Sequence, residues 1–369
     1  MTSLRWLSVL LLACVLAGAL RSEPHGVPPG EGPGSSSAES DPLHTARVER
    51  MVRDAHQALA GWQNADGSFS LPRRDHGRAA PVAVTGLAAL SLMAHGHLPD
   101  RGNDELSRAV RRAVQWLVEH CQDGGEESGY FRHDGDSVSK MHGQGYALLA
   151  LTQAAGAWGD RASDREELDG AIRRGVDLVQ RTQGLQGGWY YEPRASAAHE
   201  GSITVCMIQA LRAAKDAGYE VDPAVIEKAV GYIRKSQDPE SGRFRYQIGS
   251  ETTSWALTAA ALSTLNATGS YDSEILRDGH DALERADIWL QRRHENFQWY
   301  GSFYAAQAYW VHPDRRRFER WWDHFVDACE NERGVDGSFP DGTYGRVYAT
   351  AMVSLSLQVP FGMLPLFQR

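Results

Sequence analysis

The seven residues Gln63-Asn-Ala-Asp-Gly67-Ser-Phe69 carry the pattern that decides the fold: glutamine, a few polar residues, glycine, any residue and an aromatic residue. The pattern recurs at Gln122–Phe131, Gln183–Trp189 and Gln237–Phe244. A further copy ends in Gly337-Ser-Phe339 with Glu330 or Asn331 in the place of the glutamine, and a degenerate copy around Phe297 to Trp299 fills the gap. Six copies indicate six structural repeats, and such a period decides the architecture before any other signal.

Each copy lies between two segments of different character. The segment before it is amphipathic, with apolar residues at helical spacing, as in Leu106, Ala109, Val110, Ala113, Val114 and Leu117. The same stripe returns within residues 168–179, 226–233 and 318–329. The segment after each copy is apolar on all sides, at residues 81–93, 145–155, 203–214, 254–265, 304–310 and 348–357. Helix start signals agree, since Asp222 precedes Pro223, and Ser163 and Glu166 have the spacing of a capping box.

These two kinds of segment predict an all-α fold. An amphipathic helix lies half exposed, whereas a helix that is apolar all round is buried. Six of each kind predict two concentric layers of six helices, with every glutamine–glycine–aromatic loop leading from the outer to the inner layer. An open solenoid of helix pairs is the alternative. We favour closure because residues 361–367 are apolar, whereas an open solenoid needs a polar terminal repeat.

The composition is that of a globular protein: 369 residues, 42% hydrophobic and 23% charged. The 38 Lys and Arg against 47 Asp and Glu give a net charge of −9, so a nucleic-acid partner is not expected. The longest apolar stretch, residues 7–20, is too short to cross a bilayer as a helix, so we expect no integral membrane span.

The N-terminus has the features of a secretory signal peptide, predicted over residues 1–19. Arg5 precedes an apolar region, and Ala17-Gly18-Ala19 fits a small-residue cleavage site. Residues 20–44 are rich in Pro, Gly and Ser and are expected to form a flexible linker, which leaves residues 45–369 as a single domain. We therefore expect an exported protein, periplasmic or extracellular. Lipidation of Cys14 is the alternative to cleavage after Ala19.

Three cysteines remain beyond the signal peptide. Cys121, Cys206 and Cys329 are widely spaced and form no Cys-x-x-Cys pair. This pattern favours buried thiols over a disulfide framework.

The repeat resembles a known family. Glutamine, glycine and an aromatic residue after an amphipathic helix are similar to the repeats of squalene and oxidosqualene cyclases and of protein prenyltransferase β subunits. The resemblance covers about residues 45–369 and implies their shared fold, an (α/α)6 toroid. The chain looks most similar to exported bacterial prenyltransferase and squalene-oxidase repeat proteins, through Gly188–Pro193, Ser202–Cys206, Tyr304–Ala308 and Leu364–Arg369. Fold and function are separable, so the chemistry needs its own test.

The motifs that carry the chemistry of these families are missing. The resemblance implies an Asp-x-Asp-Asp acid for a cyclase, and the nearest match, Asp134-Gly-Asp136, is expected in a solvated turn. It implies an Asp-x-Cys pair and a later histidine for a prenyltransferase zinc site, but no histidine follows Asp327-Ala-Cys329. We therefore expect no cofactor and no metal.

Polar and aromatic residues gather where the loops enter the apolar helices. In a closed toroid these positions meet around one end of the central cavity. We predict His199, Glu200 and His142 as acid–base groups, with the adjacent pair His199 and Glu200 foremost, because a carboxylate tunes an imidazole near neutral pH. The predicted ligand-binding residues are Thr85, Thr204, Thr253, Tyr304, Gln307 and Tyr348. Helix capping and buried hydrogen bonding are the alternative roles for each.

Three functions remain open. The first is an exported toroid that binds an apolar ligand, isoprenoid-like or lipid-like, or a peptide or partner protein in its central cavity, without the reactions of the family. The second is a terpenoid- or prenyl-transforming enzyme of non-standard mechanism. The third is a structural envelope scaffold whose centre is filled by aromatic residues, among them Tyr190, Tyr191, Trp299, Tyr300, Tyr304, Tyr309 and Trp310. The sequence leaves the ligand and the oligomeric state undetermined.

Overall fold

A computed structural model describes residues 43–69, 79–99, 102–158, 162–267 and 273–362. Contacts along the chain group residues 41–369 into one unit, separate from residues 1–40. The predicted signal peptide, Cys14, nearly all of the predicted linker and the Leu364–Arg369 ending lie outside the described residues. Export, cleavage and lipidation therefore stay predictions.

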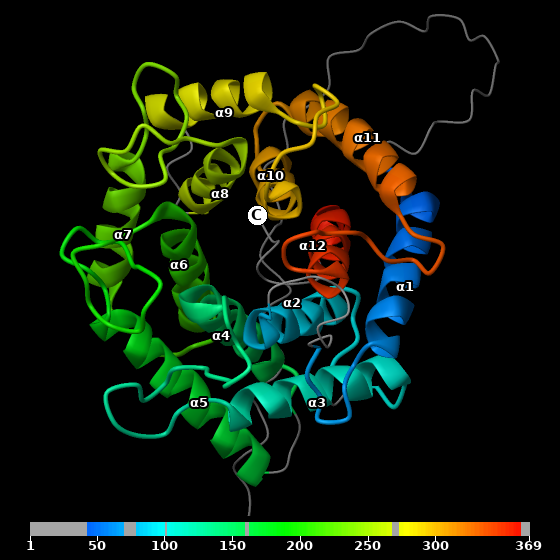
Figure 1. The fold of residues 1–369 in the computed structure, drawn as a ribbon, viewed down its shortest axis with the longest axis vertical. Coiled ribbons are helices and arrows are strands. Elements are labelled where there is room, and N and C mark those ends of the chain that lie inside the picture. Colours follow the sequence, from blue (N-terminus) through cyan, green and yellow to red (C-terminus); the bar gives the residue numbers. More distant parts are fainter. Residues whose placement is uncertain (1–42, 70–78, 100–101, 159–161, 268–272, 363–369) are drawn as a thin grey trace, which may run out of the picture. The chain divides into compact units, whose positions relative to one another are not determined.

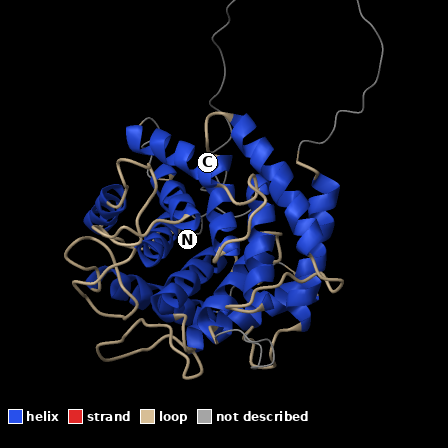
Figure 2. Cartoon of the chain, turned by 45° about the horizontal axis from the view of Figure 1, so that its top comes forward, coloured by secondary structure: helices blue, strands red, loops and turns tan. Residues whose placement is uncertain are grey.

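Twelve α-helices among the described residues alternate between an outer and an inner ring (Figure 1). The outer ring consists of α1 (Thr45–Gly61), α3 (Glu105–Glu119), α5 (Ala162–Arg181), α7 (Pro223–Lys235), α9 (Glu274–Ala286) and α11 (Arg315–Glu332). The inner ring consists of α2 (Pro81–Met93), α4 (Lys140–Ala155), α6 (Gly201–Asp216), α8 (Trp255–Asn266), α10 (Gln298–Trp310) and α12 (Arg346–Gln358). A short 3-10 turn, Val359–Phe361, follows α12. Figure 2 shows the helices joined only by loops in the described part of the chain, which is the α/α toroid that the repeat predicts.

Burial separates the two rings as the hydrophobic patterns predict. All 13 residues of α2 are buried. Helix α3 instead buries one stripe, which includes Val110, Val114 and Leu117. Burying a Val or Leu side chain contributes roughly 1.5–3 kcal/mol, so a helix that is apolar on all sides is most stable in the inner ring.

Some helix starts differ from the sequence pattern. Helices α4 and α10 begin at Lys140 and Gln298, ahead of the apolar segments. The sequence pattern missed these starts because the first turns of both helices carry polar and aromatic side chains. Helix α5 begins at Ala162, so Ser163 lies inside the first turn and the predicted capping box does not form. Asp222 caps α7 as predicted and accepts a hydrogen bond from the backbone N–H of Ala224 at 2.9 Å.

The loop glutamine joins consecutive repeats. Gln63 Nε2 donates to the carbonyl of Gly67 in its own loop at 2.9 Å and to that of Ala109 in α3 at 2.8 Å. Gln183 and Gln237 make the same two kinds of bond, each to its own loop and to the next outer helix. One side chain therefore closes a loop and fixes the neighbouring outer helix.

The loop glycine and the loop aromatic residue have separate tasks. Gly187 has a φ of +94°, and a Cβ there would lie 2.3 Å from the carbonyl oxygen of Lys228 in the next outer helix, so a side chain does not fit. The backbone N–H of Trp189 donates to Thr204 Oγ1 in α6 at 3.2 Å. The same bond to an inner helix joins Phe69 to Thr85, Phe131 to Gln144, Phe244 to Thr258 and Phe339 to Thr350.

Two copies of the repeat have a different residue at the glutamine position. In the second unit Cys121 holds this position, since its Sγ lies 3.8 Å from the carbonyl of Ala171 in α5, and Gln122 lies one residue further along. In the sixth unit Arg333, rather than Glu330 or Asn331, precedes the equivalent turn and pairs with Asp54 of α1. The sequence pattern misplaced both because neither residue is a glutamine.

The fifth unit departs furthest from the pattern. Trp289 supplies the loop aromatic ring, and its indole Nε1 donates to Ser302 Oγ in α10 at 2.8 Å. Ser302 holds the inner-helix position that a threonine or glutamine holds in the other units. The predicted copy at Phe297 to Trp299 was wrong, because these residues form the start of α10.

Contacts between the last and the first outer helices close the ring. Arg47 of α1 pairs with Asp327 and Glu330 of α11. Helix α12 packs against both α1 and α2. The described helices therefore form a closed toroid and not an open solenoid. No helix in this part of the chain combines the length and apolar character that a bilayer span requires.

Candidate functional site

A pocket of about 840 Å³ opens where the outer-to-inner loops enter the inner ring. The first turns of all six inner helices and the loops before them contribute to its walls. Small apolar side chains of α2 and α8 form part of the lining, among them Ala83, Val84, Leu87, Ala256 and Leu257. The volume is in the range of small-molecule sites, so the centre of the toroid is hollow at this end.

Six tyrosines dominate the rest of the pocket: Tyr146, Tyr191, Tyr246, Tyr300, Tyr344 and Tyr348. The phenol oxygens of Tyr191 and Tyr246 lie 2.6 Å apart and bond to each other. Those of Tyr146 and Tyr300 are buried in the wall, where the Cys206 thiol faces Tyr146 and the Tyr304 hydroxyl faces Tyr300 without meeting strict hydrogen-bond geometry. Tyr191 and Tyr246 are partly exposed, so their hydroxyls are the ones suited to bind polar atoms of a ligand.

The inner ring is filled further along α10. Tyr304, one turn beyond Tyr300, is fully buried, and its hydroxyl lies 3.6 Å from Cys206 Sγ. Gln307 accepts hydrogen bonds from Gln209 Nε2 at 3.2 Å and from Ser263 Oγ at 3.1 Å. Tyr304 and Gln307, both predicted to bind ligand, therefore pack across the centre and do not line the pocket.

Ser202 in the pocket wall connects a histidine with a buried carboxylate. Its hydroxyl lies 2.9 Å from His142 Nε2 and 2.8–2.9 Å from both oxygens of Glu200. Glu200 is the N-cap of α6 and accepts hydrogen bonds from the backbone N–H groups of Ser202 and Ile203. His142 Nε2 is 3.8 Å from Glu200 Oε1. The three side chains form a connected path from the pocket into the protein.

Burial shifts the proton affinities of both ends of this path. Glu200 is fully buried, and burial raises its pKa from 4.5 to about 7 although the cap hydrogen bonds act in the opposite direction. The His142 ring is 23% exposed, and its surroundings desolvate it and lower its pKa to about 4. At neutral pH the imidazole is therefore uncharged, while Glu200 exists in both protonation states.

The path can move a proton between Glu200 and the pocket. With Glu200 ionised, Ser202 donates to the carboxylate and can accept from an Nε2–H of His142. With Glu200 protonated, the carboxyl donates to Ser202, which donates to the Nε2 lone pair of His142. Moving each hydrogen along these bonds transfers one proton from Glu200 to His142.

Most of the other predicted site residues do not line the pocket. His199 is buried with its Nδ1 2.9 Å from the hydroxyl of Tyr232, so it does not join Glu200 in an acid–base pair. Thr85 and Thr204 accept the structural bonds of the loop aromatic residues. Thr253 is outside the pocket lining, although both of its chain neighbours belong to it. Tyr348 and His142 are the predicted residues that line the pocket.

Two residues of the pocket have a left-handed backbone. Lys140 has a φ of +45° and Phe297 a φ of +63°. Non-glycine residues pay roughly 1–3 kcal/mol for such conformations, which are common at functional sites. Phe297 is also about half exposed, at 51%, at the pocket rim. His44 and Arg292 have the same kind of backbone outside the pocket lining, so left-handed residues are not confined to this end of the toroid.

Sequence reasoning missed most of the pocket tyrosines, although one signal was available. Tyr191 follows the loop aromatic Trp189 by two residues, and Tyr246 follows Phe244 by two. A tyrosine at a constant offset from the repeat should reach the same level of the ring in each unit. Tyr146 and Tyr344 have no such regular position.

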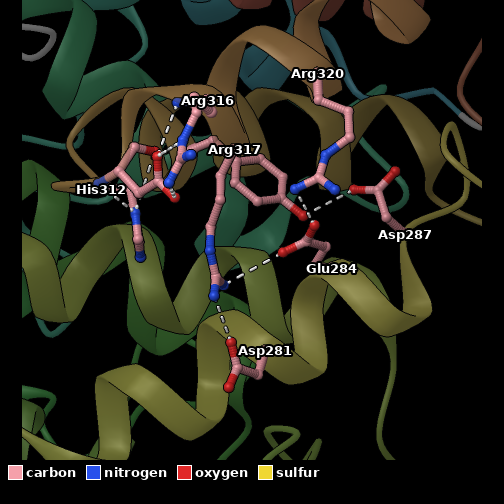
Figure 3. Close-up of polar contacts among 9 residues, drawn as sticks. Asp281, Glu284, Asp287, His312, Arg316, Arg317 and Arg320 are labelled. Carbon is pink, nitrogen blue, oxygen red and sulfur yellow. Dashed lines mark hydrogen bonds and ion pairs between the residues drawn. The ribbon is translucent and has the colours of Figure 1, made fainter.

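Asp287 is a second buried carboxylate, at the end of α9. It accepts hydrogen bonds from Trp255 Nε1 at 3.1 Å and from the Tyr309 hydroxyl at 3.3 Å. Burial raises its pKa to about 7. Nearby, Arg317 and Arg320 of α11 pair with acidic residues of α9, as Figure 3 shows. Asp287 does not line the pocket, and its contacts anchor α8, α9 and α10 to one another.

Comparisons with known proteins give the fold only. No protein-family model matches the sequence, and a search of curated proteins finds no match. An inactive variant of the α-1,6-mannanase GH76A of Salegentibacter sp. HEL1_6, in complex with α-1,6-mannotetrose, matches with a TM-score of 0.57 and 10% identity, over 84% of this chain and 97% of that one.

Two further solved structures have the same architecture. A possible member of the GH105 family from Klebsiella pneumoniae subsp. pneumoniae MGH 78578 matches with a TM-score of 0.53 and 12% identity, over 89% of this chain and 94% of that one. A glycosyl hydrolase family 88 protein from Bacteroides vulgatus matches with a TM-score of 0.53 and 8% identity, over 84% of this chain and 98% of that one. The similarity to prenyltransferase and squalene cyclase repeats holds at the level of the toroid and does not extend to an assignment among prenyltransferases. The protein is an (α/α)6 toroid.

Proposed function

We propose that the protein binds a neutral, hydroxyl-rich ligand, a short oligosaccharide, in the tyrosine-lined pocket. The observation that carries this proposal is the set of six tyrosines in the pocket lining, of which Tyr191 and Tyr246 are partly exposed and bond to each other through their phenol oxygens. A ligand with hydroxyl groups can bond to these phenol groups, whereas a hydrocarbon cannot. The ligand is therefore more polar than the isoprenoid that the sequence pattern suggests.

The charges of the pocket favour an uncharged ligand. Lys140 Nζ lies 2.7 Å from Glu192, and Glu295 lies 3.1 Å from Arg293. The lowered pKa of His142 leaves its imidazole uncharged at neutral pH. A charged ligand would have to break one of these ion pairs.

The shape of the lining residues suits sugar rings. Tyrosine offers a flat apolar face together with a polar edge, and the pyranose ring of a saccharide has the complementary combination of C–H faces and peripheral hydroxyls. The exposed Phe297 ring adds an aromatic surface at the rim. The inactive variant of the α-1,6-mannanase whose fold is similar is in complex with α-1,6-mannotetrose, which agrees with saccharide binding in a toroid.

Hydrolysis of a saccharide is a second candidate function, favoured by the path from Glu200 through Ser202 to His142. Most glycoside hydrolases need two carboxyl groups about 5–10 Å apart, one as acid and one as base or nucleophile. Glu295 is the one acidic residue among the described pocket lining, and Glu200 lies behind Ser202. A neutral Glu200 would supply a proton through Ser202 to His142 Nε2 as His142 Nδ1 gives up its own proton to the ligand, so the imidazole stays uncharged.

Binding is tested by calorimetric titration of the purified chain with short neutral manno-, gluco- and xylo-oligosaccharides, and separately with farnesol. We expect saturable binding of a saccharide that Tyr191→Phe and Tyr246→Phe each weaken by about fivefold, because each loses one hydrogen bond of about 1 kcal/mol. Tyr219→Phe is the matched control, since its hydroxyl bonds Asp169 outside the pocket. Binding of farnesol with no saccharide binding would restore the apolar-ligand hypothesis, and no binding of either would favour the scaffold.

Catalysis is tested on any saccharide that binds. Ser202→Ala interrupts the path and keeps the carboxylate at the helix N-terminus. Loss of product formation with retained affinity would support the enzyme. Equal loss of affinity and rate, or no product from the unaltered protein, would leave binding as the function.

A further inference from the structure

Three histidines lie together at the far end of α2 from the pocket. His56 belongs to α1, and His95 and His97 follow the end of α2. One ring nitrogen from each of the three lies within 4.8 Å of the others. The ring centroids are 5.3 Å apart for His56 and His95, 5.8 Å for His56 and His97, and 5.5 Å for His95 and His97. None of them belongs to the pocket lining.

His56 is held in place by the inner ring. Its side chain is buried, and Nε2 lies 3.2 Å from Ser91 Oγ of α2 and 3.0 Å from Ser354 Oγ of α12. The second nitrogen, Nδ1, is also buried, and no described group forms a hydrogen bond with it. Burial, together with the neighbouring His95 and His97 rings, lowers the pKa of His56 well below its usual range. Among the described residues, the Nδ1 of His56 is thus a buried nitrogen for which no group meets hydrogen-bond geometry.

The two loop histidines are presented by a tight turn. Gly96 between them has a φ of +90°, and the backbone N–H groups of His95 and His97 both donate to the carbonyl of Leu92. His97 Nδ1 lies 3.4 Å from Asp104 Oδ1, which leaves Nε2 as its nitrogen for a ligand. A carboxylate on the far nitrogen of a histidine is the usual partner of a metal-binding imidazole, because it fixes the ring orientation and raises its basicity.

We propose that His56, His95 and His97 bind one divalent transition-metal ion, with Zn²⁺ as the expected ion. Imidazole nitrogen suits Zn²⁺, and three histidines with an open fourth position form a known type of zinc site. His56 supplies Nδ1 and His97 supplies Nε2. The ion would link α1 to the loop between α2 and α3, next to the place where α12 closes the ring.

The geometry requires small movements only. A tetrahedral ion with Zn–N bonds of about 2.1 Å places the nitrogens about 3.4 Å apart. One ring nitrogen of each histidine lies within 4.8 Å of the others, so these nitrogens must approach one another by up to about 1.4 Å. His95 is exposed and His97 partly exposed, so these rings can move while the buried His56 stays in place.

The test uses the full chain without a histidine tag, treated with chelator and then titrated with Zn²⁺ alone. Stoichiometry and affinity come from calorimetry, and the coordination geometry comes from the visible spectrum after Co²⁺ replaces Zn²⁺. His95→Ala and His97→Ala are the ligand variants, since the buried His56 is needed for packing. His133→Ala is the matched control, because the His133 ring lies beside those of His120 and Trp116 in a different cluster.

We expect one Zn²⁺ per chain, a tetrahedral Co²⁺ spectrum, and a loss of about 100-fold or more in affinity in both ligand variants. The control should bind as the unaltered protein does. Asp104→Asn should lower the affinity by about 10- to 100-fold, while asparagine still caps α3. Absence of stoichiometric Zn²⁺ binding, or binding that His95→Ala and His97→Ala leave unchanged, would overturn the proposal. Circular dichroism and a cooperative thermal transition show that each variant is folded when it is titrated, and Zn²⁺ should raise the Tm of the unaltered protein and of His133→Ala but not that of the ligand variants.

Discussion

Replacing Glu200 by glutamine should change how the stability of the protein depends on pH. Glu200 is fully buried, and burial raises its pKa from 4.5 to about 7 in the folded state. Between these two values the unfolded chain releases the proton while the folded chain keeps it. The folded state therefore binds more protons, and the free energy of unfolding falls as the pH rises through this window.

The size of the effect follows from the two values. The pKa of Glu200 rises from 4.5 in the unfolded chain to about 7 in the folded protein, and this difference corresponds to about 3 kcal/mol in the free energy of unfolding over the whole window. Between about pH 5 and pH 8 the larger part of it is lost, about 2–3 kcal/mol. Glu200→Gln cannot ionise and lacks this loss. Its own cost, an altered cap of α6 worth about 1 kcal/mol, is the same at both pH values.

Urea denaturation of both proteins at the two pH values measures the effect. We expect the free energy of unfolding of Glu200→Gln, relative to the unaltered protein, to rise by about 2–3 kcal/mol from pH 5 to pH 8. Comparing the two proteins removes the contributions of the other titrating groups. A relative stability that is the same at both pH values would show that Glu200 ionises in the folded protein as it does in the unfolded chain. The neutral carboxyl donor of the proton path would then be refuted.

Three further predictions concern the scaffold. Gly187→Ala should lower the free energy of unfolding, measured by urea denaturation, by about 1–3 kcal/mol, because it forces a side chain to a φ of +94° and against the Lys228 carbonyl. A loss smaller than that of an exposed Gly→Ala change would contradict this account. Asp287→Asn should become more stable relative to the unaltered protein between pH 5 and pH 8, for the same reason as Glu200→Gln, since burial raises the pKa of Asp287 to about 7. Cys206 should react with a thiol reagent only after unfolding, because it is buried and burial raises the pKa of its thiol to about 12; rapid labelling of the native protein would refute it.

The fold could be predicted from sequence because the residues of each repeat make the same contacts in the structure. Gln183 bonds to its own loop, and the backbone at Gly187 touches the next outer helix. The backbone N–H of Trp189 bonds to the inner helix that follows. These interactions are local to one repeat and its neighbour. Six repeats of such pairwise contacts leave the toroid as the consistent arrangement, even where Cys121 or Arg333 replaces the glutamine.

The site could be predicted only in part because it depends on how different repeats meet. Adjacency in the chain favoured His199 as the partner of Glu200, but the extended backbone of Glu200 at the start of α6 sends the two side chains to different sides. His142 comes from the preceding inner helix and reaches Glu200 through Ser202. The histidine cluster was missed for the same reason, since His56 and His95 are brought together only by the packing of α1 beside α2.

The departure of the fifth unit from the repeat explains where the pocket lies. In the regular units the chain enters the inner helix with its loop aromatic N–H committed to a threonine or glutamine. In the fifth unit Trp289 makes this link through its indole, and residues 290–297 follow before the inner helix begins. That segment instead places Glu295, Asn296 and Phe297 at the pocket rim, with Phe297 in a strained backbone conformation. Departures from local sequence rules are expected at functional sites, which agrees with our proposal that this pocket, to which all six repeats contribute, binds a ligand.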